Sequence, residues 1–420
     1  MTQRFFYGWV VLAAAFVIIT MSIGTLFTLG VFLQPIEQSM GWSRSGIGAI
    51  GLFNWIVMGA GGVVSGFVSD RLGTRRVVLV GAMLLGLGLV LSSYVQHLWQ
   101  LYVSFGLLVG AGVSAFYVPL TVLAIKWFEG RRGMAASVVS AGNGLGILAL
   151  APLTRWLINE FDWRVAFLVL GNLAWVAVLP TAMLLRGPAG RTSVRSAGDA
   201  DARLSADWGS AGAISGPPHM VGSPWASWPF WAIALTHFCC CAAHSGPLFH
   251  LVSHAMDQGV PKMAAAGILG ASGLTSIFGR IGTGIVADRV GAKGTLLSAL
   301  SLQAALIFLY LFATSAGALW ALSLAFGVAY GGAMPLYALV TREYFGERVL
   351  GTAYGGVFFI SCIGMGLGSY AGGAIHDLLG TYQWLFLGSF AIGMMAIVLG
   401  MTLRSPVAVP VPRPSPAMGA

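Results

Sequence analysis

The sequence predicts an all-α integral membrane protein in which twelve transmembrane helices form two six-helix bundles. Three observations support this fold class. Only 8% of the 420 residues are charged and 57% are hydrophobic, whereas a soluble domain carries about 25% charged residues. Apolar runs of spanning length, about 20 residues, recur along the whole chain. A long polar stretch separates six of these runs from six others.

The helices are expected at these apolar runs, in chain order. Those of the first half cover residues 7–33, 46–69, 77–95, 99–126, 133–157 and 163–186. Those of the second half cover residues 226–252, 263–287, 295–314, 318–342, 351–376 and 381–404. The first run is long enough to span a bilayer and lacks the form of a cleavable leader, so we expect it to remain as the first helix.

Composition sets the expected domain boundaries. Residues 1–186 are predicted to form an N-terminal six-helix bundle, and residues 226–404 a C-terminal one. Residues 187–225 are rich in Gly, Ser, Ala and Pro and predict a cytoplasmic linker. Residues 405–420 are rich in proline and predict a disordered cytoplasmic tail.

Basic residues gather on one side of this predicted topology. The loops and ends of that side contain Arg4, Arg71, Arg75, Arg76, Lys126, Arg131, Arg132, Arg186, Arg191, Arg195, Arg203, Arg289, Lys293, Arg342, Arg348, Arg404 and Arg413. The opposite side receives only Arg44, Arg155, Arg164 and Lys262. This positive-inside bias predicts a multi-pass protein of the plasma (inner) membrane with both termini cytoplasmic. The basic residues of the cytoplasmic loops account for the net charge of +9, so no nucleic-acid partner is expected.

A short motif occurs at the equivalent place in each half. Residues 66–76 (GFVSDRLGTRR) join the second and third expected helices, and residues 284–293 (GIVADRVGAK) join the eighth and ninth. Two halves that carry the same loop indicate a parallel repeat about an axis along the membrane normal. The charged residues of the two loops are expected to hold a gate between the halves rather than to bind substrate: Asp70, Arg71, Asp288 and Arg289.

Arg280 is the candidate for the centre of a binding site. It is the single charged residue of the apolar run 264–287, and a guanidinium stays charged there because its pKa is above about 12. A charge near the membrane centre costs roughly 2.5 kcal/mol or more. No Asp or Glu is obviously placed to pair with it. We therefore expect Arg280 to bind an anion inside a membrane cavity.

Other polar residues are expected at a similar depth. Asn143 lies about ten residues into its helix, roughly 15 Å from the cytoplasmic end. It is expected to bind the carboxylate or a hydroxyl of the anion, the alternative being a hydrogen bond between helices. Three intramembrane tyrosines are further candidates, although only some of them need face a cavity: Tyr117, Tyr330 and Tyr354.

The remaining candidates are apolar residues and histidines. Leu145, Phe359 and Cys362 are candidates for an apolar wall against a small methyl group, with ordinary core packing as the alternative. His250 is a candidate proton carrier or hydroxyl partner; the alternative is a neutral histidine bonded to carbonyls that Pro247 frees. Cys239, Cys240 and Cys241 are expected to be buried thiols. No metal site and no cofactor are expected.

The paired loops in a chain of six plus six helices resemble those of the major facilitator superfamily. A narrower resemblance is to the monocarboxylate transporter family, including its bacterial proton-coupled lactate transporters. The motifs that carry it are YGWVV at 7–11, KWFEGRRGMA at 126–135, AGNG at 141–144, LAPL at 150–153, FDWRVAF at 161–167 and FGR at 278–280. The resemblance implies that Arg280 binds the substrate carboxylate.

Two departures from the animal members bear on proton coupling. Those members carry a lysine where this chain has Phe27, and an aspartate where it has Ser276. Because both residues are associated with proton coupling in the animal proteins, the resemblance implies coupling here without assigning its carriers.

The predicted function is therefore symport of a small monocarboxylate, L-lactate or pyruvate, with a proton by alternating access. The alternative transport function is an oxalate/formate-type organic anion exchanger, although a dicarboxylate would prefer two cations. No nucleophile–base pair, metal cluster or phosphate-binding loop indicates an enzyme. A receptor would need an output domain. The expected partners are the small organic anion, a proton and the lipid bilayer, and we expect a monomer.

Overall fold

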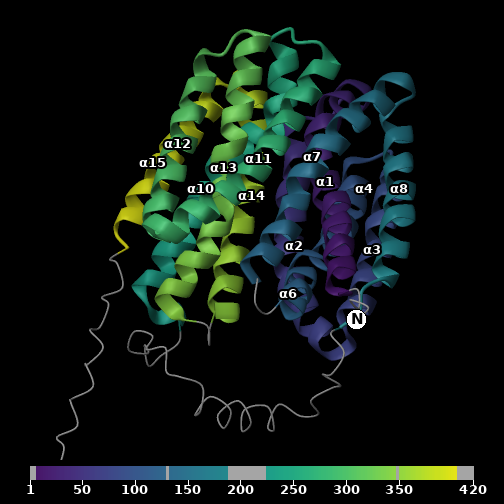
Figure 1. Ribbon diagram of the computed structural model, residues 1–420. Coiled ribbons are helices and arrows are strands. Elements are labelled where there is room, and N and C mark those ends of the chain that lie inside the picture. The colour runs from purple at the N-terminus through teal and green to yellow at the C-terminus, as the bar shows by residue number, and fades with distance from the viewer. Residues whose placement is uncertain (1–5, 129–131, 188–223, 347–349, 404–420) are drawn as a thin grey trace, which may run out of the picture.

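Twelve helices that are long and apolar enough to cross a membrane run through the part of the chain that the structure, a computed structural model, describes. The described residues are 6–128, 132–187, 224–346 and 350–403. The helices form two bundles that lie side by side, the first half of the chain in purple to blue and the second in teal to yellow (Figure 1). The all-helical fold class with twelve spans is thereby confirmed.

The first bundle contains six spans. They are α1 (Gly8–Met40), α2 (Arg44–Leu72), α3 (Thr74–Ser92), a fourth span in four pieces, α7 (Arg132–Glu160) and α8 (Trp163–Met183). The pieces of the fourth span are α4 (Leu98–Leu101), the π-helix η1 (Tyr102–Val109), α5 (Gly110–Ser114) and α6 (Tyr117–Trp127).

The second bundle follows a short 3-10 turn, η3 (Pro224–Ala226). Its spans are α10 (Trp228–Asp257), α11 (Lys262–Val290), α12 (Ala292–Leu309) with η4 (Tyr310–Phe312), α13 (Ala316–Phe345), α14 (Leu350–Leu379) and α15 (Gln383–Met401). Residues 188–223 and 404–420 lie outside the described residues, so the linker and the tail stay predictions.

Several helices are longer than their apolar runs. The helix α1 continues to Met40 instead of ending near residue 33, and α10 continues to Asp257 instead of residue 252. Polar residues such as Gln34 and Glu37 end the hydrophobic pattern, but the backbone remains helical until Gly41 takes a left-handed φ of 67°. Hydropathy therefore located the spans, and glycine geometry ends α1.

The repeated loops share one backbone geometry. Gly73, between α2 and α3, has φ 85° and ψ 142°, and Gly291, between α11 and α12, has φ 92° and ψ 148°. An L-residue rarely adopts such a positive φ, so glycine is required at both turns. We call the face with these turns the inner face. The connections 41–43, 161–162, 258–261 and 380–382 lie on the opposite, outer face, the names following the predicted orientation.

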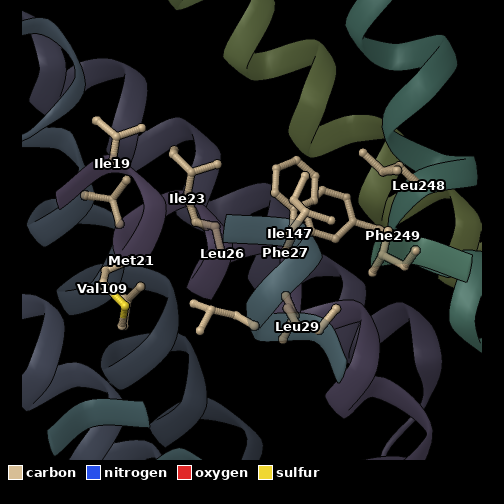
Figure 2. Close-up of a cluster of buried hydrophobic side chains, with 14 of the residues drawn as sticks. Ile19, Met21, Ile23, Leu26, Phe27, Leu29, Val109, Ile147, Leu248 and Phe249 are labelled. Carbon is tan, nitrogen blue, oxygen red and sulfur yellow. The ribbon is translucent and has the colours of Figure 1, made fainter. Parts of the chain in front are cut away.

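The two bundles meet closely at mid-depth and in their outer halves. A Cβ atom on Gly273 of α11 would lie 2.7 Å from the carbonyl oxygen of Gly144 on α7, and one on Gly48 of α2 would lie 2.8 Å from the carbonyl oxygen of Ser369 on α14. Small residues let these helices approach backbone to backbone. Between them, Phe27 of α1 stacks on Phe249 of α10 with ring centroids 5.1 Å apart, within the buried cluster of Figure 2.

Candidate functional site

A cavity of about 90 Å³ lies at the middle of the interface between the bundles. An ordered water needs roughly 10–15 Å³ by the same measure, so the cavity has room for a ligand of a few heavy atoms. Polar and apolar side chains from both bundles line it: Ile23, Phe27, Trp55, Met58, Tyr117, Asn143, Ile147, His237, Cys241, His244, Arg280, Tyr330, Met334, Tyr354, Phe358, Ser361, Cys362 and Met365.

Arg280 brings a positive charge into this cavity. The residue is 5% exposed, and its Nη1 donates to Ser140 Oγ of α7 at 2.7 Å. Its Nε is buried and has no hydrogen-bond partner, and no described carboxylate lies within ion-pair distance of it. A buried charge without a counter-charge is costly. The guanidinium therefore has the charge and the free N–H groups that a carboxylate ligand would satisfy.

Two neutral polar groups in the cavity are also unsatisfied. The Oδ1 of Asn143 and the phenol oxygen of Tyr330 are buried without a hydrogen-bond partner among the described residues. Leaving a buried polar atom unpaired costs about 1–3 kcal/mol. Both atoms line the same cavity as Arg280, so a hydroxylated anion would meet a cation and two hydrogen-bonding groups at once.

His244 of α10 also lines the cavity, whereas the histidine predicted as a candidate, His250, does not. The Nδ1 of His244 lies 2.7 Å from the carbonyl oxygen of Cys240, so Nδ1 carries the proton and Nε2 is left as an acceptor. Its ring stacks on Tyr330 at 5.6 Å. His237 also lines the cavity. The seven-residue spacing from His237 to His244 places both on one helix face, a signal that separates them from His250.

The other predicted site residues divide into two groups. Tyr117, Tyr354 and Cys362 line the cavity. Leu145 is half-buried and does not line it. Phe359 is also half-buried and does not line it; its ring lies against Gly59 of α2, where the bundles touch. The roles of all five residues in substrate binding stay predictions.

On the inner side, Tyr117 of α6 and Phe358 of α14 cover the cavity. Their rings are nearly parallel, with centroids 5.8 Å apart, and they come from opposite bundles. Closer to the inner face, Cβ atoms on Gly282, Gly284 and Gly355 would meet nothing within 4 Å. The bundles thus pack backbone to backbone in the outer half, and an aromatic pair covers the inner side of the cavity.

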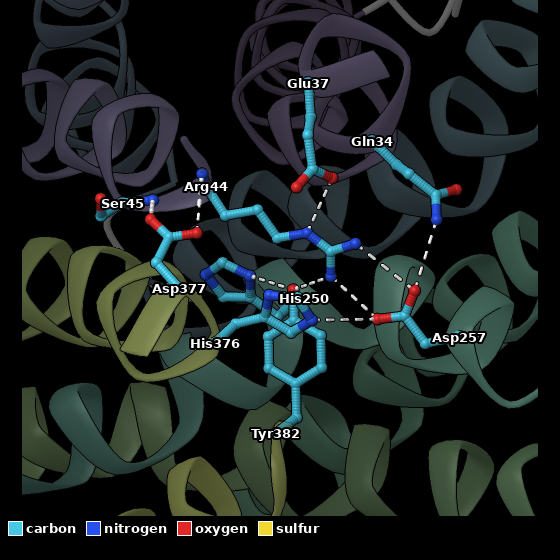
Figure 3. Close-up of polar contacts among 9 residues, drawn as sticks. All are labelled: Gln34, Glu37, Arg44, Ser45, His250, Asp257, His376, Asp377 and Tyr382. Carbon is cyan, nitrogen blue, oxygen red and sulfur yellow. Dashed lines mark hydrogen bonds and ion pairs between the residues drawn. The ribbon is translucent and has the colours of Figure 1, made fainter. Parts of the chain in front are cut away.

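The outer side is closed by an ionic network centred on Arg44, at the start of α2 (Figure 3). Its Nε contacts Glu37 Oε2 at 2.8 Å, and its Nη1 contacts Asp257 Oδ2 at 2.8 Å. The Nη1 also donates to the phenol oxygen of Tyr382 at 2.9 Å. Because Asp257 and Tyr382 belong to the second bundle, one guanidinium joins the two halves.

Asp377 of α14 reinforces this closure. Its carboxylate accepts from the backbone N–H groups of Arg44 at 3.1 Å and of Ser45 at 2.7 Å, the first residues of α2. A carboxylate at a helix N-terminus satisfies free N–H groups and complements the helix dipole. His376 lies 3.6 Å from Asp257 Oδ2 in the same network.

His250 belongs to this closure rather than to the cavity lining. Its Nε2 lies 2.8 Å from the carbonyl oxygen of Ser369, and its Nδ1 lies 3.2 Å from the Tyr382 hydroxyl. A carbonyl only accepts, so Nε2 carries the proton and the Tyr382 hydroxyl donates to Nδ1. Burial raises the pKa of the Tyr382 phenol, which stays neutral and accepts from Arg44. The carbonyl is that of α14, not one freed by Pro247.

The predicted gate residues are described only in part. Arg71 and Arg289 are exposed on the inner face, and the guanidinium of Arg71 lies 4.1 Å from the ring centroid of Phe67. The side chains of Asp70 and Asp288 lie outside the described residues, so a gating role for these four stays a prediction. Within the described ranges, no group of three or more His, Cys, Asp or Glu side chains is placed to hold a metal ion.

Comparisons with known proteins agree with this architecture. A family model, the Major Facilitator Superfamily, matches residues 11–369 and 283–419. Monocarboxylate transporter 13 of Bos taurus is 27% identical over 402 residues, covering 94% of this chain and 89% of that protein. Monocarboxylate transporter 2 of Homo sapiens is 26% identical over 411 residues, covering 93% and 84%. These relatives confirm the resemblance seen in the motifs.

A solved structure shows the same fold. It is that of a bacterial homologue of the human lysosomal transporter Spinster, in an inward-facing and unoccupied conformation. The TM-score is 0.71 at 13% sequence identity, and the alignment covers 95% of this chain and 97% of the other.

Proposed function

The chain belongs to the Major Facilitator Superfamily, and we propose that it is a secondary transporter that moves a small monocarboxylate, L-lactate or pyruvate, together with a proton by alternating access. Its similarity to monocarboxylate transporters over more than nine tenths of the chain supports the substrate class. The motif resemblance supports the proton coupling. We place the protein in the plasma (inner) membrane with both termini cytoplasmic, in line with the positive-inside bias.

The observation that carries the proposal is the Arg280 guanidinium in the central cavity. It has free N–H groups, no described carboxylate partner and a position between the two bundles. A planar guanidinium matches both oxygens of one carboxylate. Arg280 is the single Lys or Arg that lines the cavity among the described residues, which favours a singly charged anion over a dicarboxylate.

The lining of the cavity supports a small substrate. Apolar side chains such as Phe27, Met58 and Ile147 would face the methyl group of lactate or pyruvate. Asn143 and Tyr330 would bond its oxygen substituent. A cavity of about 90 Å³ leaves little room for a longer chain.

Alternating access is supported by the asymmetry of the two ends. The outer end is held by ion pairs and close glycine contacts between bundles, whereas the Tyr117–Phe358 pair covers the inner side of the cavity. Rocking of the bundles that parts the Arg44 network would expose the cavity to the outer face. The same motion would bring the inner ends, with their repeated charged loops, together.

Transport in proteoliposomes tests the proposal. Radiolabelled L-lactate should accumulate when an inward proton gradient is imposed, and Arg280→Ala should abolish accumulation. Arg164→Gln is the matched control, because Arg164 donates to the carbonyls of Ser93 and Val95 and does not line the cavity. Normal transport by Arg280→Ala would refute the assignment. Counterflow of preloaded oxalate without a pH gradient would identify an anion exchanger instead.

A further inference from the structure

A second cavity, of about 600 Å³, opens on the outer face. It lies among the end of α1, the end of α7, the start of α8 and the start of α11. Seven of the ten residues that line it are polar or charged, two of them basic and one acidic: Gln34, Pro35, Gln38, Ser39, Arg155, Ile158, Asn159, Asp162, Trp163 and Lys262. We call it the outer pocket.

Arg155 is the residue of the outer pocket that needs an explanation. It lies near the outer end of α7, as its predicted place on the outer side implies, and it is 2% exposed. Its Nη2 donates to the carbonyl oxygen of Val31 at 3.2 Å and contacts Met256 Sδ at 3.6 Å. The Val31 carbonyl is free because its helical partner four residues later is Pro35, which has no N–H. Part of the role of Arg155 is therefore to satisfy this carbonyl.

That structural role uses only one of the three guanidinium nitrogens. The Nε is buried without a hydrogen-bond partner, and Nη1 makes no hydrogen bond to any described residue. No described carboxylate lies within ion-pair distance of Arg155. One carbonyl and one thioether do not neutralise a buried positive charge, and such a charge costs several kcal/mol. An anion in the pocket would supply what is missing.

The other charges facing the pocket leave it positive. Lys262 is exposed at its rim. The Asp162 carboxylate is engaged as the N-cap of α8, where it accepts from the backbone N–H of Trp163 at 2.5 Å. Two cations against one carboxylate give the lining a net charge of +1. Gln34, Gln38 and Asn159 add neutral amide donors, which suit carboxylate oxygens.

The pocket adjoins the closed outer end of the transport path. Gln34, which lines it, donates to Asp257 Oδ1 at 3.4 Å, and Asp257 is the ion-pair partner of Arg44. Met256, which contacts Arg155, precedes Asp257 in α10. A ligand bound at Arg155 would therefore wait beside the network that must part before the central cavity opens outward.

We propose that the outer pocket is a second anion-binding site, in which Arg155 and Lys262 bind a small monocarboxylate before it reaches Arg280. The identity of the anion rests on the proposed function, whereas the site itself rests on the unpartnered guanidinium and the charge of its pocket. The site concentrates the substrate at the outer face and does not itself move it.

Binding of L-lactate to the purified full-length chain in lipid nanodiscs tests this inference. Saturation-transfer NMR detects weak binding, and a competition series with chloride reports the charge dependence. The wild-type chain should show two classes of site. In the Arg280→Ala background one class should remain, and adding Arg155→Gln should weaken it at least tenfold. Glutamine removes the charge and keeps a polar side chain, and a thermal melt checks that the fold is retained without the Val31 hydrogen bond.

Lys262→Ala is the second variant, because this exposed side chain makes no hydrogen bond or ion pair with a described residue. In the Arg280→Ala background it should weaken lactate binding severalfold, while Arg164→Gln, which removes a charge from the same face outside the pocket, should not. If lactate binding in Arg280→Ala is absent, or is indifferent to both Arg155→Gln and Lys262→Ala, the inference is wrong. If instead binding depends on Arg155 but not on Arg280, the outer site stands and the proposed function fails.

Discussion

Arg44 of α2 and Asp257 of α10 form an ion pair of 2.8 Å that crosses from one six-helix bundle to the other. The Arg44 side chain is 7% exposed, and the same guanidinium contacts Glu37 and Tyr382. The Asp257 and Glu37 side chains are 30% and 29% exposed, so water screens these carboxylates and losing the pair costs less than the roughly 3–5 kcal/mol of a fully buried pair. Arg44 therefore joins the two bundles at the outer face, beside the close contact of Gly48 with Ser369 and the Asp377 hydrogen bonds.

Replacing Arg44 tests the closure directly. In Arg44→Ala the closed conformation loses its ionic link, so the central cavity should open to the outer face more often. Cys241 and Cys362 line that cavity and provide native reporters. A membrane-impermeant thiol reagent added outside should label them at least tenfold faster than in the wild-type chain.

Two control variants check that the labelling reports on the cavity cysteines and on the Arg44 network. Labelling should disappear when Cys241 and Cys362 are both replaced by serine. Arg164→Gln, which leaves the contacts between bundles intact, should label at the wild-type rate. An unchanged rate in Arg44→Ala would show that the network does not hold the outer face closed.

Asn143 is predicted to recognise the hydroxyl of lactate, since its Oδ1 is a buried acceptor without a partner. Asn143→Leu keeps the side-chain volume and removes the acceptor. The KM for L-lactate should rise about tenfold, the value of a lost hydrogen bond of about 1.4 kcal/mol. Propionate, which lacks the hydroxyl, should inhibit lactate uptake equally well in both chains. A parallel loss for propionate would indicate a role in carboxylate binding or packing instead.

A substitution at Gly48 tests the close approach of α2 and α14. A methyl group in Gly48→Ala would lie 2.8 Å from the Ser369 carbonyl oxygen, and overpacking of this kind costs roughly 1–3 kcal/mol. Because the proposed alternating-access cycle brings the two bundles together here, turnover should fall at least fivefold. Gly388→Ala is the control, since its methyl group would meet nothing within 4 Å. Equal turnover in the two variants would contradict a tight contact at Gly48.

We expect His250 to contribute to closure of the outer face rather than to substrate binding. Its hydrogen bonds to Ser369 and Tyr382 connect it to the Arg44 network. His250→Gln should therefore leave the KM for lactate within about twofold of wild type and increase outer labelling of the cavity cysteines. A tenfold rise in KM with unchanged labelling would instead restore His250 as a substrate ligand.

Much of the architecture could be predicted from local sequence patterns. The spans follow from hydropathy, and the repeated turns from the motif at Gly73 and Gly291. The cost of a lone membrane charge singled out Arg280, which lines the central cavity, while its role in binding stays a prediction. The spacing of His237 and His244 also marks a shared helix face, and both line the cavity, whereas the predicted candidate His250 does not. Helix ends were harder to predict, because α1 continues through polar residues that belong to an interface rather than to a loop.

The sequence alone determined the fold class, the equivalence of the two halves and the chemistry available at Arg280, because each depends on residues close together in the chain. Only the tertiary structure decided that Arg44 meets Asp257, that Arg155 is buried beside a free carbonyl, and that Asn143 and Tyr330 share a cavity with Arg280. Those relationships join helices far apart in sequence. They depend on which helix faces pack together and on where glycine lets two backbones touch, and no single segment encodes that.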